Sequence, residues 1–223
     1  MILTTKNNLS KNYISEIKFQ FGFLKDFLNY DPGDIEITIL SLKEFEEIYE
    51  KENGKKSDNF VVGFAAKKGR IFLLDKEDFI LKKHNKEEFE KVILHEFCHI
   101  FIRRIINPRK TYPWIEEGIC QYLSFGDLRP NIHVLVDFNK LKSIEDWRIY
   151  HPYQQSALFF KFLVKTYGKN KLIDFIFRLK TIFEERAFKE VFGKELNGLQ
   201  EDFFASLKNE KITLSSNSMQ KKD

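Results

Sequence analysis

The chain has 223 residues, of which 43% are hydrophobic and 31% are charged. This balance predicts a globular protein with a substantial core and excludes a disordered polymer or a membrane bundle, because no uncharged apolar stretch approaches the roughly 18–20 residues that cross a bilayer. The formal net charge of +4 comes from 37 Lys and Arg against 33 Asp and Glu, which is too slight to indicate a nucleic-acid or anionic-membrane partner.

The N-terminus and the cysteines predict a cytoplasmic protein. Residues 1–8 contain no charged region followed by an apolar one, the pattern of a secretory signal. Cys98 and Cys120 are too few for a disulfide framework, so we expect reduced, buried thiols. We expect a single domain over residues 1–208, followed by a disordered polar tail over residues 209–223.

The first part of the chain predicts helices around a small sheet. Its expected elements are a helix over residues 10–30, a strand over residues 35–42 and a charged helix over residues 43–52. Residues 60–66 and 70–74 are β-prone runs joined by Lys67-Lys68-Gly69, which indicates a hairpin. The sheet is therefore expected to be mostly antiparallel.

The second part of the chain predicts mainly helices. Residues 87–106 are the longest periodic segment, and Asn107-Pro108 ends it. Pro113 suits the first turn of a helix that runs to about residue 125, and residues 132–136 are expected to form a short strand. Residues 153–207 are helical in pattern, with breaks at Gly168, Gly193 and Gly198. The predicted fold class is α+β, with a small sheet followed by a long helix and a largely helical second half.

Residues 95–99 carry the clearest chemical signal, because His95-Glu96-Phe97-Cys98-His99 fits the pattern H-E-x-x-H. Positions i and i+4 of a helix share one face, so both imidazoles can bind one metal ion such as zinc. Glu96 lies about 100° round the helix from His95, where it can reach a water on that metal without binding the metal itself. The alternative is a chance occurrence of the pattern in a chain with 5 histidines. The two remaining candidates near the second half, His133 and His151, are expected to pack or to face solvent.

Zinc requires a further protein ligand, and the next predicted helix offers Glu116 and Glu117. Spacing alone does not choose between them. Either one would complete a set of two histidines and a glutamate with an open fourth position, which is typical of catalytic zinc sites. The competing interpretation is a solvated helix N-terminus, where the helix dipole favours acidic residues.

The motif His95-Glu96-x-x-His99 followed by Trp114-x-x-Glu117-Gly118-x-x-x-Tyr122 resembles the gluzincin zinc metallopeptidases, most closely their minimal peptidase MA-like members. The resemblance implies a thermolysin-like catalytic domain that binds Zn2+ through His95, His99 and Glu117. It thereby selects Glu117 over Glu116.

The resemblance extends to both sides of these motifs. Upstream, residues 62–73 resemble the hairpin whose edge strand lines the cleft, which implies that Gly63, Phe64 and Ala65 pair with an extended substrate. Downstream, Pro152-Tyr153 resembles the segment where related aminopeptidases carry a transition-state tyrosine.

Two departures from the gluzincin pattern bear on function. Gln121 stands where many members carry an acidic residue that orients a zinc-binding histidine, so it can accept a hydrogen bond but adds no negative charge. Around Gly63 there is no acidic residue of the kind that aminopeptidases use to hold a free amine. The sequence therefore favours an endopeptidase over an aminopeptidase.

The expected activity is zinc-dependent hydrolysis of a peptide or protein substrate, with Glu96 as general base and Tyr153 as donor to the oxyanion. One alternative is a catalytically weak or inactive metal-binding regulatory module of the same fold. Retention of Glu96 argues against it. Another is a non-haem iron oxygenase, since two histidines and a carboxylate also suit Fe(II), although a glutamate between the histidines favours hydrolysis.

Overall fold

The computed structural model describes residues 2–5, 11–126, 135–143, 145–146 and 152–219. The chain divides into two compact units, unit 1 with Met1–Ile105 and Leu123–Phe125, and unit 2 with Ile106–Tyr122 and Gly126–Asp223. The single domain expected over residues 1–208 stays a prediction. His133, His151 and the start of the expected strand at 132–136 lie outside the described residues, and the last two residues of that segment are not in a strand.

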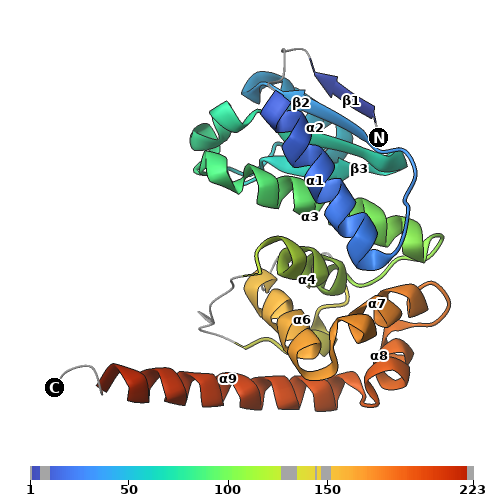
Figure 1. Ribbon diagram of the computed structural model, residues 1–223, viewed down its shortest axis with the longest axis vertical. Coiled ribbons are helices and arrows are strands. Elements are labelled where there is room, and N and C mark those ends of the chain that lie inside the picture. Colours follow the sequence, from blue (N-terminus) through green and yellow to red (C-terminus); the bar gives the residue numbers. More distant parts are fainter. Residues whose placement is uncertain (1, 6–10, 127–134, 144, 147–151, 220–223) are drawn as a thin grey trace. The chain divides into compact units, whose positions relative to one another are not determined.

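Unit 1 contains a four-stranded sheet with the order β1-β2-β4-β3 (Figure 1). The strands are β1 (Ile2–Thr5), β2 (Glu36–Leu40), β3 (Gly63–Ala66) and β4 (Arg70–Leu74). β2 pairs in parallel with both β1 and β4, whereas β3 and β4 are antiparallel. The α+β class is thus confirmed, but the expectation of a mostly antiparallel sheet is wrong.

The helices between the strands explain this mixed pairing. Parallel neighbours need a long crossover connection, and α1 (Lys11–Leu28) supplies one between β1 and β2. α2 (Leu42–Asn53) lies in the connection that follows β2. β3 and β4 are instead joined by a single 3-10 turn, Lys67–Gly69, which permits antiparallel pairing.

The β3–β4 turn depends on a glycine. Gly69 has a φ of +72°, a left-handed conformation that favours glycine. A Cβ at this position would collide with Nη2 of Arg104. That guanidinium is held in place because it donates hydrogen bonds to the carbonyl oxygens of Pro32 and Asp34.

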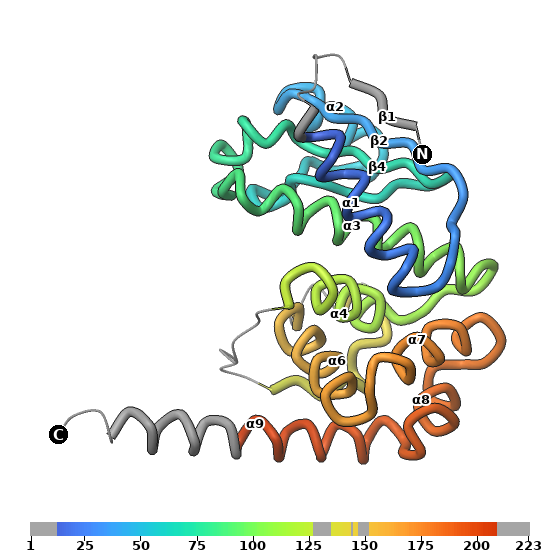
Figure 2. The backbone as a smooth tube through the Cα atoms, viewed as in Figure 1, coloured from blue at the N-terminus to red at the C-terminus, as the bar shows by residue number. Residues whose placement is uncertain are grey.

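Helices cover both faces of the sheet in unit 1. Phe64 of β3 packs its ring against Phe45 and Tyr49 of α2, with ring centroids 5.7 and 5.1 Å away. On the other face, α3 (Phe89–Ile106) lies beside α1, and Phe21 of α1 contacts Phe97 of α3 at 5.5 Å. Figure 2 shows the backbones of α1 and α3 side by side along this face. The motif helix is thereby anchored in the core of unit 1.

Unit 2 is helical and has an aromatic core. Its helices are α4 (Pro113–Ser124), which ends in unit 1, then α6 (Tyr153–Tyr167), α7 (Lys169–Arg178), α8 (Glu184–Phe192) and α9 (Leu196–Met219). Trp114 of α4 is fully buried and stacks on Phe138 with ring centroids 4.3 Å apart. Other fully buried aromatic side chains of this core are Phe159, Phe160, Phe175, Phe188 and Phe203.

The helix boundaries in unit 2 follow the predicted breaks only in part. Gly168 and Gly193 end α6 and α8, as predicted. Gly198 lies inside α9 instead of at a break, and α7 and α8 are separated at residues 179–183, where no glycine or proline occurs. α9 runs to Met219, and the disordered tail expected over residues 209–223 stays a prediction.

Across the described residues, no helix combines the length and the apolar character that crossing a membrane requires.

Candidate metal centre

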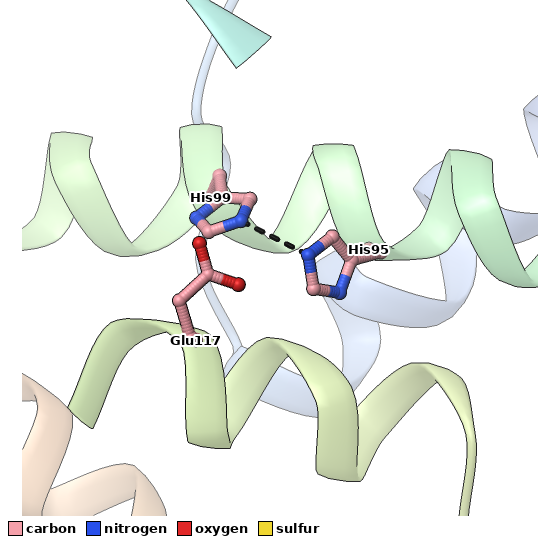
Figure 3. Close-up of side chains that lie close together, drawn as sticks. All are labelled: His95, His99 and Glu117. Carbon is pink, nitrogen blue, oxygen red and sulfur yellow. Dashed lines mark hydrogen bonds between the residues drawn. The ribbon is translucent and has the colours of Figure 1, made fainter. Parts of the chain in front are cut away.

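α3 presents His95 and His99 on one side, one helical turn apart (Figure 3). Their Nε2 atoms are 3.1 Å apart, and their ring centroids are 4.7 Å apart. Two nitrogens bound to one tetrahedral zinc ion at 2.0–2.1 Å would be about 3.3 Å apart. The two imidazoles therefore have the separation of a chelating pair before any ion is considered.

Glu117 of α4 belongs to the same group. One nitrogen of each histidine and one carboxylate oxygen of Glu117 all lie within 4.8 Å of one another. Figure 3 shows this carboxylate directed toward the two rings. Glu116, the equal candidate by spacing, is not a member of the group. Two imidazoles and a carboxylate are the donor set of many catalytic zinc sites, so these residues could hold such an ion.

Glu96 lies on the side of α3 that faces β3. Its side chain is only 6% exposed. A Cβ built on Gly63 of β3 would lie 3.3 Å from Cγ of Glu96 and 3.0 Å from Cγ1 of Val92. The absence of a side chain at position 63 thus lets the strand approach the helix at the level of the motif glutamate.

Comparison with family models shows which group of proteins the chain belongs to. The model of the BSP family, described as "Peptidase of plants and bacteria", matches residues 72–203, more than half of the chain. The chain belongs to this peptidase family. The match includes the whole of α3 and α4, and so His95, Glu96, His99 and Glu117. A search of curated proteins finds no match. The narrower resemblance to gluzincins stays a prediction.

β3 is an edge strand of the peptidase, as the hairpin resemblance implies. The amide of Leu74 donates to the carbonyl oxygen of Val62 at 2.8 Å, and the register pairs Phe64 with Phe72. Because hydrogen-bonded and non-hydrogen-bonded pairs alternate in an antiparallel ladder, the backbone of Phe64 faces β4. Of the three residues expected to pair with substrate, Gly63 and Ala65 are therefore the ones whose N–H and C=O point to the free edge.

Arg103 also lies at this edge, although its place in the last turn of α3 predicts only a solvated helix end, where the helix dipole favours cations. It follows His99 by four residues on α3, and its Nη1 donates to the carbonyl oxygen of Ala65 at 3.0 Å. The spacing 95, 99, 103 places all three side chains on one stripe of the helix, and this signal was present in the sequence. The sequence did not reveal that Arg103 binds Ala65 of β3, because the two residues are distant in the chain.

Gly118, the residue after Glu117, has a packing role in unit 2. A Cβ there would lie 2.8 Å from Cβ of Ser156 and 2.9 Å from Cδ2 of Phe160. α4 and α6 therefore approach closely at this point. The contact fixes the turn of α4 that carries Glu117, which gives the Glu-Gly pair of the motif a physical reason.

Gln121 and Tyr153 occupy positions that leave their expected roles as predictions. Gln121 is half-buried one turn after Glu117 on α4. Tyr153 is the first residue of α6 and follows Pro152. Burial raises the pKa of Tyr122, the residue after Gln121 on α4, so its hydroxyl stays protonated through the neutral range. 

Phe125 is a neighbour of the histidine pair that the sequence did not single out. Its ring centroid lies 6.4 Å from that of His95 in an edge arrangement. The Phe125 ring also contacts Lys91, whose Nζ lies 5.9 Å from the ring centroid. Phe125 thus packs against His95 and limits the orientations open to its imidazole.

Proposed function

We propose that this member of the peptidase family is a zinc-dependent endopeptidase, with His95, His99 and Glu117 as the metal ligands. The observation that carries the proposal is the 3.1 Å separation of the two Nε2 atoms together with the carboxylate of Glu117 in the same group. Zinc bound there would supply a water of pKa near 7 and a Lewis acid for the scissile carbonyl.

Glu96 is the proposed general base. It neighbours His95 on α3 and is largely buried, so its carboxylate is shielded from bulk water. In the proposed reaction it accepts a proton from the attacking water and passes that proton to the leaving amine. Tyr153 is the proposed donor to the developing oxyanion, in line with the gluzincin resemblance.

The free edge of β3 is the proposed substrate track. The outward N–H and C=O groups of Gly63 and the outward N–H of Ala65 offer an extended peptide the hydrogen bonds of an added strand, while the C=O of Ala65 accepts from Arg103. The segment Gly63–Ala66 carries no acidic side chain that would hold a free amino terminus. This supports cleavage within chains over removal of N-terminal residues. The cytoplasmic location expected from the sequence stays a prediction.

The test combines metal analysis with a cleavage assay. Purified protein is expected to contain about one zinc ion per chain, and to cleave unfolded protein substrates. Glu96→Gln should keep the metal and lose at least about 100-fold in kcat, because a general base contributes roughly 100- to 10,000-fold. Iron in place of zinc would contradict the metal assignment. If zinc is bound and both proteins are equally active, Glu96 is not the base. If zinc is bound and both proteins are inactive, the protein is a non-catalytic module.

A further inference from the structure

The C-terminal part of the motif helix carries a positive charge onto the substrate edge. Arg103 is solvent-exposed, and its Nη1 donates to the carbonyl oxygen of Ala65 at 3.0 Å. His99 precedes it by one turn on the same stripe of α3, about 6 Å along the helix axis. The guanidinium is therefore fixed beside the strand on which an extended peptide would pair.

The faces of β3 determine which part of a peptide would meet Arg103. The Cβ direction of Gly63 points to Val92 and Glu96, so this residue faces α3. Ala65 is two residues further along and faces the same way, because side chains alternate in a strand. In an added antiparallel strand, the residue opposite Ala65 also projects toward α3. Its side chain would be directed to the side of the strand that Arg103 occupies.

The chain direction then gives the position within the substrate. β3 runs from Gly63, beside Glu96, toward Ala65, beside Arg103. An antiparallel peptide runs the other way, so the residue opposite Ala65 lies two residues nearer the peptide's N-terminus than the residue opposite Gly63. With Glu96 as the base, the residue at Arg103 is on the N-terminal side of the bond that is cut.

Two exposed side chains at the end of β3 carry the same positive charge as Arg103. Lys67 and Lys68, at the end of β3, are both exposed. Arg70, the next cation along the chain, pairs with Glu52 at 3.2 Å. A guanidinium has five N–H donors in a planar fork that matches a carboxylate, and it remains charged at every working pH. A carboxylate on the substrate complements this end of the edge.

We propose that Arg103 is a specificity-determining residue that selects substrates with Asp or Glu on the N-terminal side of the cleaved bond. The inference rests on the proposed peptidase function and names the substrate class of that site. Arg103 acts here through direct contact with the substrate side chain, while its bond to Ala65 holds it in place. The competing role is closure of the strand edge against added strands, for which charged residues are often used.

The experiment compares matched peptides that differ at one residue, with Glu, Gln or Lys on the N-terminal side of the cleaved bond. The wild-type zinc enzyme should cleave the Glu peptide with a kcat/KM about threefold to tenfold above that of the Gln peptide, and the Lys peptide less well still. Arg103→Ala should remove the preference, and Arg103→Glu should reverse it toward Lys. Raising the salt concentration should reduce the wild-type preference, because the contact is exposed.

Arg186→Ala is the matched control, since it removes the same charge from α8, where Arg186 pairs with Glu190. It should keep the wild-type preference. An unchanged Glu-to-Lys ratio in Arg103→Ala would overturn the inference while leaving the peptidase function intact. A uniform gain for all three peptides in Arg103→Ala would also overturn it, because that result indicates edge closure.

If no peptide is cleaved, that result counts against the proposed function. A binding measurement then still tests the role of Arg103. Zinc-loaded Glu96→Gln protein is titrated with the fluorescently labelled Glu and Lys peptides, alone and in combination with Arg103→Ala. Tighter binding of the Glu peptide that is lost in the double variant supports the role of Arg103. Equal binding of both peptides by Glu96→Gln protein overturns it.

Discussion

Gly63 of β3 lies against Glu96 of α3, so close that a Cβ at position 63 would be 3.3 Å from Cγ of Glu96. Cδ2 of Leu73 and Cγ1 of Val92 would be closer still, at 2.9 and 3.0 Å. The edge strand and the motif helix are therefore held at a spacing that no larger residue at position 63 permits without a shift of its neighbours. The same glycine presents outward backbone groups for the proposed substrate.

Gly63→Ala should therefore lower both stability and activity. Overpacking a core typically costs about 1–3 kcal/mol of unfolding free energy, and any shift here moves Glu96. Urea unfolding and peptide cleavage measure the two effects. Gly22→Ala in α1 is the control, because a Cβ there meets no heavy atom within 4 Å, and alanine is about 1 kcal/mol better than glycine inside a helix. Wild-type stability and activity in Gly63→Ala would show that the close approach is not a constraint.

Gly118→Ala should disturb the helix that carries Glu117. The added methyl group would meet Ser156 and Phe160 at under 3 Å, so we expect a loss of about 1–3 kcal/mol and weaker zinc binding. Gly198→Ala in α9 is the matched variant, since its Cβ would meet only Cδ of Lys194, at 3.9 Å. Thermal unfolding and zinc titration compare the two. Equal behaviour of both variants would contradict the packing role given to Gly118.

The choice of third ligand predicts a difference between two adjacent glutamates. Glu117→Ala removes a proposed zinc ligand and should weaken zinc affinity by more than about 100-fold, beyond the 10- to 100-fold typical of residues that only support a ligand. Glu116→Ala should change the affinity little, because Glu116 is not in the ligand group. Competition with a chromogenic chelator measures both. Loss of zinc in the Glu116 variant alone would reverse the assignment.

The ion pair between Glu46, which is partly exposed, and the buried Lys82 predicts a contribution to acid stability. Burial alone would raise the pKa of Glu46, but hydrogen bonds from Lys82 and Ser57 outweigh it and hold that pKa below the ordinary 4.5. A carboxyl group whose pKa is lower in the folded state stabilises the fold above pH 4.5, and this contribution is lost as the pH falls through the folded-state pKa.

Glu46→Gln should therefore be less stable than wild type at pH 7, with a difference that shrinks as the pH falls below the ordinary pKa of 4.5 and the wild-type carboxyl group protonates. Urea unfolding at a series of pH values measures this. Glu77→Gln is the control, because Glu77 and its partner Lys86 are both more than half exposed and such pairs contribute little. A difference between wild type and Glu46→Gln that is constant with pH would contradict the ionic origin.

Local patterns were sufficient to predict the motif helix and the two histidines that share one side of it. The spacing of His95 and His99 follows from helical geometry alone, and the segment that carries them is long and strongly apolar. The β3–β4 hairpin was predicted for the same reason, since its turn contains Gly69 with a left-handed backbone. These features need no information on distant parts of the chain.

Features that depend on distant contacts were missed. The bond from Arg103 to Ala65 joins residues 38 positions apart, so the arginine alone indicated only a solvated helix end. The parallel pairing of β2 with β1 and β4 depends on where crossover helices pack, which alternation within one strand does not reveal. The break between α7 and α8 lacks a glycine or proline, and packing of the two helices determines it instead.

The shortness of β3 has a consequence for turnover. The strand has four residues, and its outward groups belong to Gly63 and Ala65, one of whose carbonyls already accepts from Arg103. A peptide adding here would gain only a few hydrogen bonds, each contributing about 0.5–1.5 kcal/mol. Fragments left after cleavage can therefore dissociate readily, and copies of the protein gain little by joining their sheets into fibrils along this edge.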